Sequence, residues 1–103
     1  MGDLGYSFSP VHPGELLKEE IMYRKLTQSH LAEQMGIPYS AFNDILNCRR
    51  PLTPSTALLF EASLGISADL LMRMQLKYNM QIVRQDKSFA ARLAQIRKIA
   101  AVI

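Results

Sequence analysis

Residues 28–47 read QSHLAEQMGIPYSAFNDILN, which predicts two helices of about eight residues joined by Gly36, Ile37 and Pro38. The glycine supplies the positive φ that closes the first helix. A connection this short that begins with glycine crosses the two helices steeply, as in a helix-turn-helix. Apolar contacts that fix the crossing are expected from Leu31, Ala32, Met35, Ile37, Phe42 and Ile45. The face of the second helix left free to enter a major groove carries Tyr39, Ser40, Asn43 and Asp44.

The rest of the chain favours a helical protein of one domain. Its 103 residues fit one compact unit, and 49% hydrophobic with 20% charged residues is an ordinary globular composition. Leu and Ala number 24 residues, against 14 of Val, Ile and Thr, which favours helix over strand. No apolar run approaches the roughly 20 residues that span a bilayer, and the start lacks a secretory pattern. We therefore expect an all-α, cytoplasmic protein with no membrane segment.

Helix-starting signals divide the sequence into five or six short helices, a compact bundle. The first helix opens at His12-Pro13-Gly14-Glu15, with Leu16, Leu17, Ile21 and Met22 as its expected buried stripe. Thr27, Thr53-Pro54, Ser67 and Ser88 begin further helices. In the helix after Thr53, the residues expected to face inward are Leu58, Leu59 and Ala62.

Three segments follow from this division. Residues 1–11 form an N-terminal arm in which Leu4, Tyr6 and Phe8 alternate with small residues, as in an extended arm or an arm lying across its own core. Residues 12–83 contain the helix-turn-helix. Residues 84–103 form a basic amphipathic helix that carries the basic excess of the chain, five bases against Asp86, within a net charge of +3. The apolar stripe of that helix is Phe89, Leu93, Ile96 and Ala100.

The motif resembles the Xre/lambda-repressor-like helix-turn-helix family. The residues that carry this resemblance are Gln28, Leu31-Ala32, Met35-Gly36-Ile37 and Asp44-Ile45-Leu46-Asn47. Three further stretches narrow the resemblance to the HigA (VapI-like) antitoxins: His12-Pro13-Gly14-Glu15, Asn47-Cys48-Arg49-Arg50-Pro51-Leu52-Thr53 and Gln75-Leu76-Lys77-Tyr78-Asn79. The resemblance covers about residues 10–85. It implies a lambda-repressor-like five- to six-helix bundle and a homodimer that binds double-stranded operator DNA. It also implies a HigB-like toxin as partner, an mRNA-cutting ribonuclease of the RelE-like fold.

Carried over by motif position, the resemblance assigns a DNA-binding set. Gln28, at the start of the first motif helix, is expected to hold a phosphate with the free backbone N–H groups. Tyr39, Ser40 and Asp44 fall at base-reading positions, where a carboxylate accepts from a cytosine amino group. Asn47, Arg49 and Arg50 fit phosphate contacts. The complete expected set is Gln28, Pro38, Tyr39, Ser40, Asn43, Asp44, Asn47, Arg49 and Arg50.

Two residues depart from the family pattern. Pro38 stands where Ser or Thr usually caps the recognition helix, which removes a capping bond worth about 1 kcal/mol. Cys48 replaces the usual glycine after Asn47, and a positive φ at that position would strain a cysteine. The lone cysteine also excludes an internal disulfide, and with only His12 and His30 it does not make a zinc site.

Plainer interpretations stand beside these. Asp44 is also placed to pair with a nearby Arg or Lys, Tyr39 to pack on the preceding helix, Arg49 and Arg50 to remain solvated, and His12 to cap or pack against the first helix. The last helix has three uses: packing on its own bundle, dimerisation, or contact with a toxin or the DNA backbone.

Function also has alternatives. The sequence shows no catalytic set and no phosphate-cradling glycine loop, so we expect neither an enzyme nor a cofactor or metal. The leading hypothesis is an autorepressing antitoxin of a type II toxin–antitoxin module. The alternatives are a stand-alone Xre-family transcriptional regulator, and a protein-interaction module with a degenerate helix-turn-helix.

Overall fold

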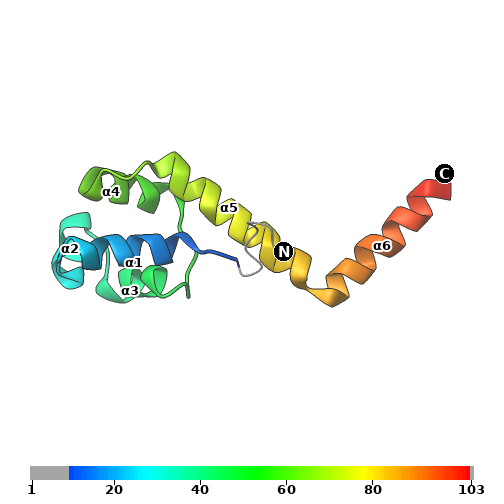
Figure 1. Cartoon of the computed structure of the whole chain (residues 1–103), viewed down its shortest axis with the longest axis horizontal. Coiled ribbons are helices and arrows are strands. Elements are labelled where there is room, and N and C mark those ends of the chain that lie inside the picture. The colour runs from blue at the N-terminus through cyan, green and yellow to red at the C-terminus, as the bar shows by residue number, and fades with distance from the viewer. Residues whose placement is uncertain (1–9, 103) are drawn as a thin grey trace.

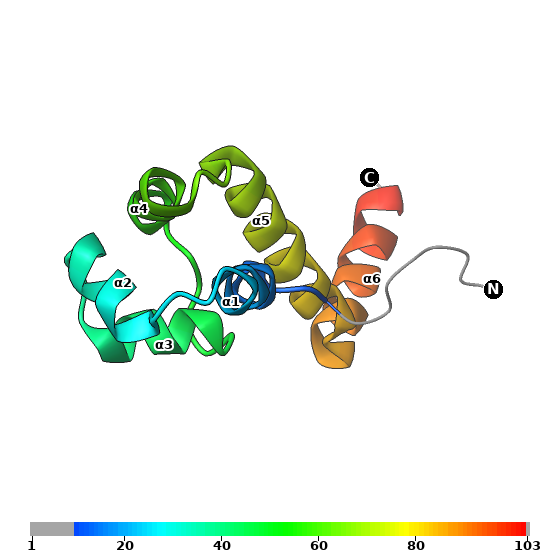
Figure 2. The ribbon, with the colours of Figure 1, turned by 60° about the vertical axis from the view of Figure 1, so that its left-hand side comes forward.

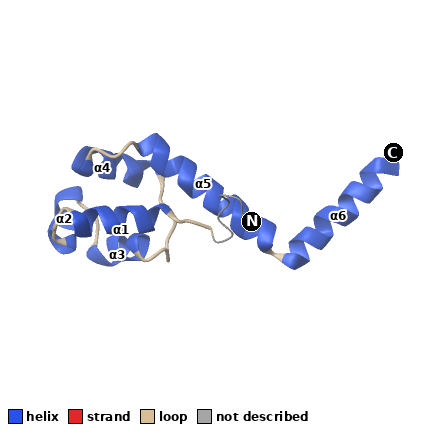
Figure 3. Ribbon diagram, in the orientation of Figure 1, coloured by secondary structure: helices blue, strands red, loops and turns tan. Residues whose placement is uncertain are grey.

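The computed structural model describes residues 10–102, and within that range every regular element is a helix (Figure 3). In chain order these are α1 (Pro13–Tyr23), α2 (Gln28–Met35), α3 (Tyr39–Leu46), α4 (Pro54–Leu64), α5 (Ala68–Gln85) and α6 (Lys87–Val102). The predicted all-α bundle with a helix-turn-helix is confirmed. The N-terminal arm predicted for residues 1–11 lies outside the described residues except for Pro10 and Val11.

The helices begin and end where local chemistry requires. His12 caps α1 by accepting a hydrogen bond from the Gly14 amide on Nδ1 at 2.9 Å, and Pro13 occupies the first turn. The hydroxyl of Thr53 accepts from the Thr56 amide, and that of Ser67 accepts from the Leu70 amide. Gly36 ends α2 in the left-handed conformation with φ of 73°. The sharp stop at Gly36 places α3 directly after α2.

Helices α1 to α4 and the first half of α5 enclose the hydrophobic core (Figures 1 and 2). At its centre the rings of Phe42 in α3 and Phe60 in α4 lie 5.6 Å apart between centroids, and both are fully buried. Leu17 and Ile21 of α1 and Leu71 of α5 complete the packing around them. The buried face of α3, the second helix of the helix-turn-helix, is thereby fixed, and so is its outward face.

Two predicted buried faces need correction. Met22 is 65% exposed, so the stripe of α1 ends at Ile21. In α4, Leu58 and Ala62 are exposed and Leu59 is only half-buried, while the buried residues are Ala57, Phe60 and Leu64. The helix carries apolar side chains on every side, so its pattern does not single out a face. Phe60 is buried in place of the predicted leucines because its aromatic side chain has more apolar surface to remove from water.

Helix α6 stands apart from the bundle. Asp86 separates α5 from α6. In both views α6 runs in a different direction from α5 and lies apart from α1 to α4 (Figures 1 and 2). Asp86 is the N-cap of α6, because its side chain accepts a hydrogen bond from the Phe89 amide at 3.0 Å. No residue of α6 is buried, which contradicts packing of this helix on its own bundle. The radius of gyration is 17.5 Å, against about 13 Å for a compact domain of this length.

Helix α5 extends to Gln85, two residues past the predicted boundary between segments 12–83 and 84–103. Within residues 10–102, no helix is both long and apolar enough to cross a membrane.

Candidate nucleic-acid interface

Helix α3 presents a polar face outward because its other side is committed to the core. Phe42, Ile45 and Leu46 are buried. Helix α3 contacts α1 and α2, and the ring of Phe42 also meets Phe60 of α4. On the opposite side Tyr39 is 50% exposed and Ser40 is exposed. Asn43 and Asp44, one turn further along, are half-buried. Four of the predicted base-reading and outward positions therefore share one accessible face of an eight-residue helix.

A network of hydrogen bonds covers the centre of this outward face. Arg49 donates from Nε to Asp44 Oδ1 at 3.1 Å and from Nη2 to Asn43 Oδ1 at 3.0 Å. Arg50 reaches the other carboxylate oxygen of Asp44 at 3.7 Å. Asn43 in turn donates to Gln28 Oε1, at a long 3.5 Å. The structure thus brings together Gln28, Asn43, Asp44, Arg49 and Arg50, and the alternative in which Asp44 pairs with nearby arginines is the one observed.

Asn47 makes two hydrogen bonds within the protein in addition to its predicted role as a phosphate contact. Its side-chain amide donates to the Asn43 carbonyl at 2.9 Å, and its Oδ1 accepts from Lys18 Nζ at 2.9 Å. Asn47 therefore ties the end of α3 to α1 and is half-buried while doing so. The sequence analysis did not single out Lys18, since a lysine on a predicted surface helix carries no signal of a partner 29 residues away.

Two buried polar side chains, Gln75 and His12, form hydrogen bonds with the backbone of the segment between α3 and α4. Gln75 of α5 accepts a hydrogen bond from the Leu52 amide at 2.7 Å. His12 bonds the backbone of Arg50, and its ring meets the Tyr78 ring edge-on at 4.9 Å between centroids. These contacts hold the backbone at Arg50 and Leu52, directly after Arg49. Gln75 had no predicted role, but a glutamine one turn after Leu71 in a buried stripe is the signal of a buried hydrogen-bond partner.

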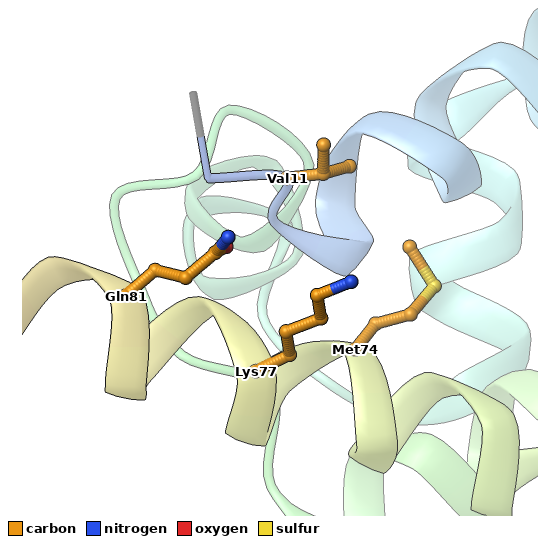
Figure 4. Close-up of a pocket in the computed structure, with 4 residues that line it drawn as sticks. All are labelled: Val11, Met74, Lys77 and Gln81. Carbon is orange, nitrogen blue, oxygen red and sulfur yellow. The ribbon is translucent and has the colours of Figure 1, made fainter. Parts of the chain in front are cut away.

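Other features of the described residues carry less chemistry. A pocket of about 170 Å³ lies between Val11 and α5, where Met74, Lys77 and Gln81 line it (Figure 4). One ammonium and one amide beside apolar atoms do not form a catalytic set. Residues 10–102 also hold no cluster of three His, Cys, Asp or Glu side chains suited to a metal ion.

Comparison with known proteins identifies the family. No protein-family model matches the chain. Virulence-associated protein I of Dichelobacter nodosus is 33% identical over 78 residues, which cover 75% of this chain and 72% of that protein. The structure of a HigA-family addiction module antidote protein from Coxiella burnetii is 30% identical, with a TM-score of 0.71 over 78% of this chain and 88% of that one. The chain belongs to the HigA (VapI-like) antitoxin family.

A second HigA-family structure bears on the outward face of α3. The Pseudomonas aeruginosa antitoxin HigA, solved with the higBA promoter, is 27% identical to this chain. Its TM-score is 0.69, with 84% of this chain and 90% of that one covered. A protein of the same fold is therefore known in a structure with promoter DNA.

The two departures from the HigA pattern have the predicted local effects. Pro38 occupies the N-cap of α3 without a side-chain capping bond. Cys48 adopts φ of 63°, the left-handed region that a glycine occupies without strain. Its thiol is half-buried, and burial raises its pKa, so the cysteine is kept in the neutral form rather than as a reactive thiolate.

The burial of His12 predicts a pH dependence of stability in this HigA-family chain. His12 is 2% exposed, and desolvation lowers its pKa below the ordinary histidine value of 6.5, against smaller opposing effects of the Arg50 backbone and Glu15. Because the unfolded state then binds the proton more tightly, the contribution of His12 is complete above pH 6.5 and is lost as the pH falls below it. Urea unfolding at pH 7.5, 6.5 and 5.5 is expected to show falling stability.

The same titration in two variants isolates His12. His12→Asn keeps a capping side chain but does not titrate, so its stability is expected to change less between pH 7.5 and 5.5. His30→Asn, at an exposed position on α2, is expected to retain the pH dependence of the parent. An equal flattening in both variants would contradict the assignment to His12.

Proposed function

We propose that this chain is a DNA-binding antitoxin that represses its own operon as a dimer and neutralises a HigB-like, mRNA-cleaving toxin in the cytoplasm. The observation that carries the proposal is the outward face of α3, which the bundle leaves accessible. Tyr39 and Ser40 lie on this face, and Arg49 and Arg50 contact Asp44 from the segment that follows the helix. The HigA-family relationship supports the antitoxin role, and the promoter complex of a HigA neighbour supports DNA as a partner.

Each group on this face has a chemical use against a duplex. Insertion of α3 in the major groove brings Tyr39 and Ser40 to base edges or adjacent phosphates, because both lie in its first turn. Gln28 begins α2, so its side chain and the unpaired amides of that first turn suit a phosphate. Arg50 lies just beyond α3 with an exposed side chain that suits a second phosphate. Pro38 and Asn47 flank α3 and set its ends rather than supply charge.

Dimerisation is assigned to α6. Its stripe consists of Phe89, Leu93, Ile96 and Ala100, of which Leu93 is half-buried and the other three are exposed. A second copy of this helix offers the same stripe, and an isologous contact would remove both from water. A dimer places two recognition helices in successive major grooves, so the operator is expected to be a near-palindrome with half-sites about one helical turn apart.

DNA binding is tested by fluorescence anisotropy with a duplex from upstream of the protein's own reading frame, a scrambled duplex as control, and several salt concentrations. The wild type is expected to bind the upstream duplex selectively, with affinity that falls steeply with salt. Arg49→Ala/Arg50→Ala is expected to bind at least tenfold more weakly and with a shallower salt slope, since phosphate neutralisation is lost. Equal and feeble binding of the wild type to both duplexes would refute the repressor proposal.

The toxin is tested by coexpression with the adjacent reading frame. A stable complex and relief of growth arrest are expected from an antitoxin. DNA binding without either result would instead indicate a stand-alone regulator, and neither DNA nor toxin binding would indicate a protein-interaction module. The three outcomes are distinguishable because DNA and toxin binding are measured separately.

A further inference from the structure

Arg49 lies over the middle of the outward face of α3, although it belongs to the segment that follows the helix. Asp44 and Asn43 are adjacent on that face, and Arg49 donates to both, with Nε and Nη2 engaged at 3.0–3.1 Å. Within residues 10–102, its Nη1 group has no hydrogen-bond partner, and the side chain remains 58% exposed. The guanidinium is therefore held in place, and the two N–H donors of Nη1 stay free on an exposed side chain.

The charges of this group do not suit a phosphate contact by Arg49. Its guanidinium is already neutralised by Asp44 at 3.0 Å, so it contributes little net charge to counterion release. The carboxylate beside it also repels a phosphate. A base edge, in contrast, is recognised by placed hydrogen-bond donors, and restraint before binding reduces the entropy lost on contact.

The two N–H donors of the free Nη1 group suit one base in the major groove. Guanine presents O6 and N7 as two adjacent acceptors, and arginine is their most frequent partner. We infer that Arg49 reads a guanine in each half-site, and that Asp44 and Asn43 are positioning residues which hold Arg49 rather than read bases themselves. This inference rests on the proposed DNA binding and replaces the expected cytosine contact of Asp44.

Arg50 is the contrasting neighbour. It has one contact with Asp44, at 3.7 Å, and that contact is longer than any of those made by Arg49. A side chain restrained so weakly is free to follow a phosphate, where charge matters more than orientation. Arg50→Ala is expected to reduce the salt slope by about 0.9 per phosphate contact, whereas Arg49→Ala is expected to leave the slope nearly unchanged.

The test is selection of binding sites from a randomised 30-base-pair duplex library by the full chain. The wild type is expected to enrich a site in which one G·C pair per half-site is preferred on the order of tenfold or more. Arg49→Ala and Asp44→Ala are each expected to reduce that preference below about threefold at the same pair. Asp44→Asn, which keeps an acceptor for Arg49, is expected to retain part of it.

Two further readouts separate positioning from damage to the fold. Asp44→Ala removes a negative charge, so its affinity for a scrambled duplex is expected to rise several-fold while selectivity falls; a misfolded variant would lose both. Glu20→Ala is the control, because it also removes one negative charge. Glu20 forms an exposed ion pair with Arg24 at 2.7 Å, and its loss is expected to leave the selected site unaltered.

The outcomes divide cleanly. Adding Asp44→Ala to Arg49→Ala is expected to change the selected site no further, because a positioning residue acts only through Arg49. A preference that survives Arg49→Ala and disappears only with Asp44→Ala would assign the base contact to Asp44 and overturn the inference. A wild type that enriches no site would refute the proposed DNA binding itself.

Discussion

Gly14→Ala is expected to lower the free energy of unfolding by about 2 kcal/mol or more, which for a domain of this size lowers Tm by roughly 8–16 °C. A Cβ at residue 14 would overlap the backbone carbonyl oxygen of Ile45 in α3, and it would also crowd Nδ1 of His12 at 3.0 Å. A backbone carbonyl inside a helix has no rotamer to change, so α1 and α3 must move apart. Thermal and urea unfolding measure the loss.

The same substitution at Gly65 is the matched control. Gly65 has φ of 74° and open space around it, so an added Cβ meets no atom, and only backbone strain of about 1 kcal/mol is expected. Gly65 ends α4, away from α3, and Gly65→Ala is expected to keep full DNA affinity. Gly14→Ala displaces the recognition helix, so its DNA affinity should fall even at temperatures where it remains folded. A loss at Gly14 no larger than at Gly65 would contradict the close contact between α1 and α3.

His12-Pro13-Gly14-Glu15 illustrates how far the sequence predicts this fold. The cap and the first-turn proline are local features, and both appear as predicted. The closeness of Gly14 to Ile45 is a tertiary contact across 31 positions, which no local pattern contains. The buried faces of α2 and α3 were predictable because their polar and apolar residues separate clearly. In α4 apolar residues occur on every side among the polar ones, and its buried face was predicted wrongly.

The candidate interface shows the same division. The sequence placed Tyr39, Ser40, Asn43 and Asp44 on one face, since helical spacing alone decides that. It did not decide what each polar group bonds to. Arg49 folds back over Asn43 and Asp44 because Cys48 turns the chain with a positive φ, and a loop conformation of this kind is not encoded by periodicity. The predicted DNA contacts of the whole set remain predictions.

Leu93→Asp/Ile96→Asp is expected to convert the chain from dimer to monomer and to weaken operator binding by about a hundredfold or more, since the two half-sites would no longer be bound together. Ile96 is 55% exposed, and no residue of α6 is buried in the described chain. Two carboxylates in the stripe would oppose their copies across an isologous contact. Size-exclusion chromatography with light scattering measures the mass, and anisotropy measures the affinity.

The position of α6 makes this variant informative about assembly rather than folding. Helices α1 to α4 and the first half of α5 form the core without any α6 residue, so the substitutions remove no core contact. The monomeric variant is therefore expected to unfold with a Tm that no longer depends on protein concentration, while its helical content is largely retained. Ala91→Asp adds a charge on the opposite side of α6 and is expected to remain dimeric. A double variant that stays dimeric with unchanged affinity would assign dimerisation to another surface and leave α6 to a different partner.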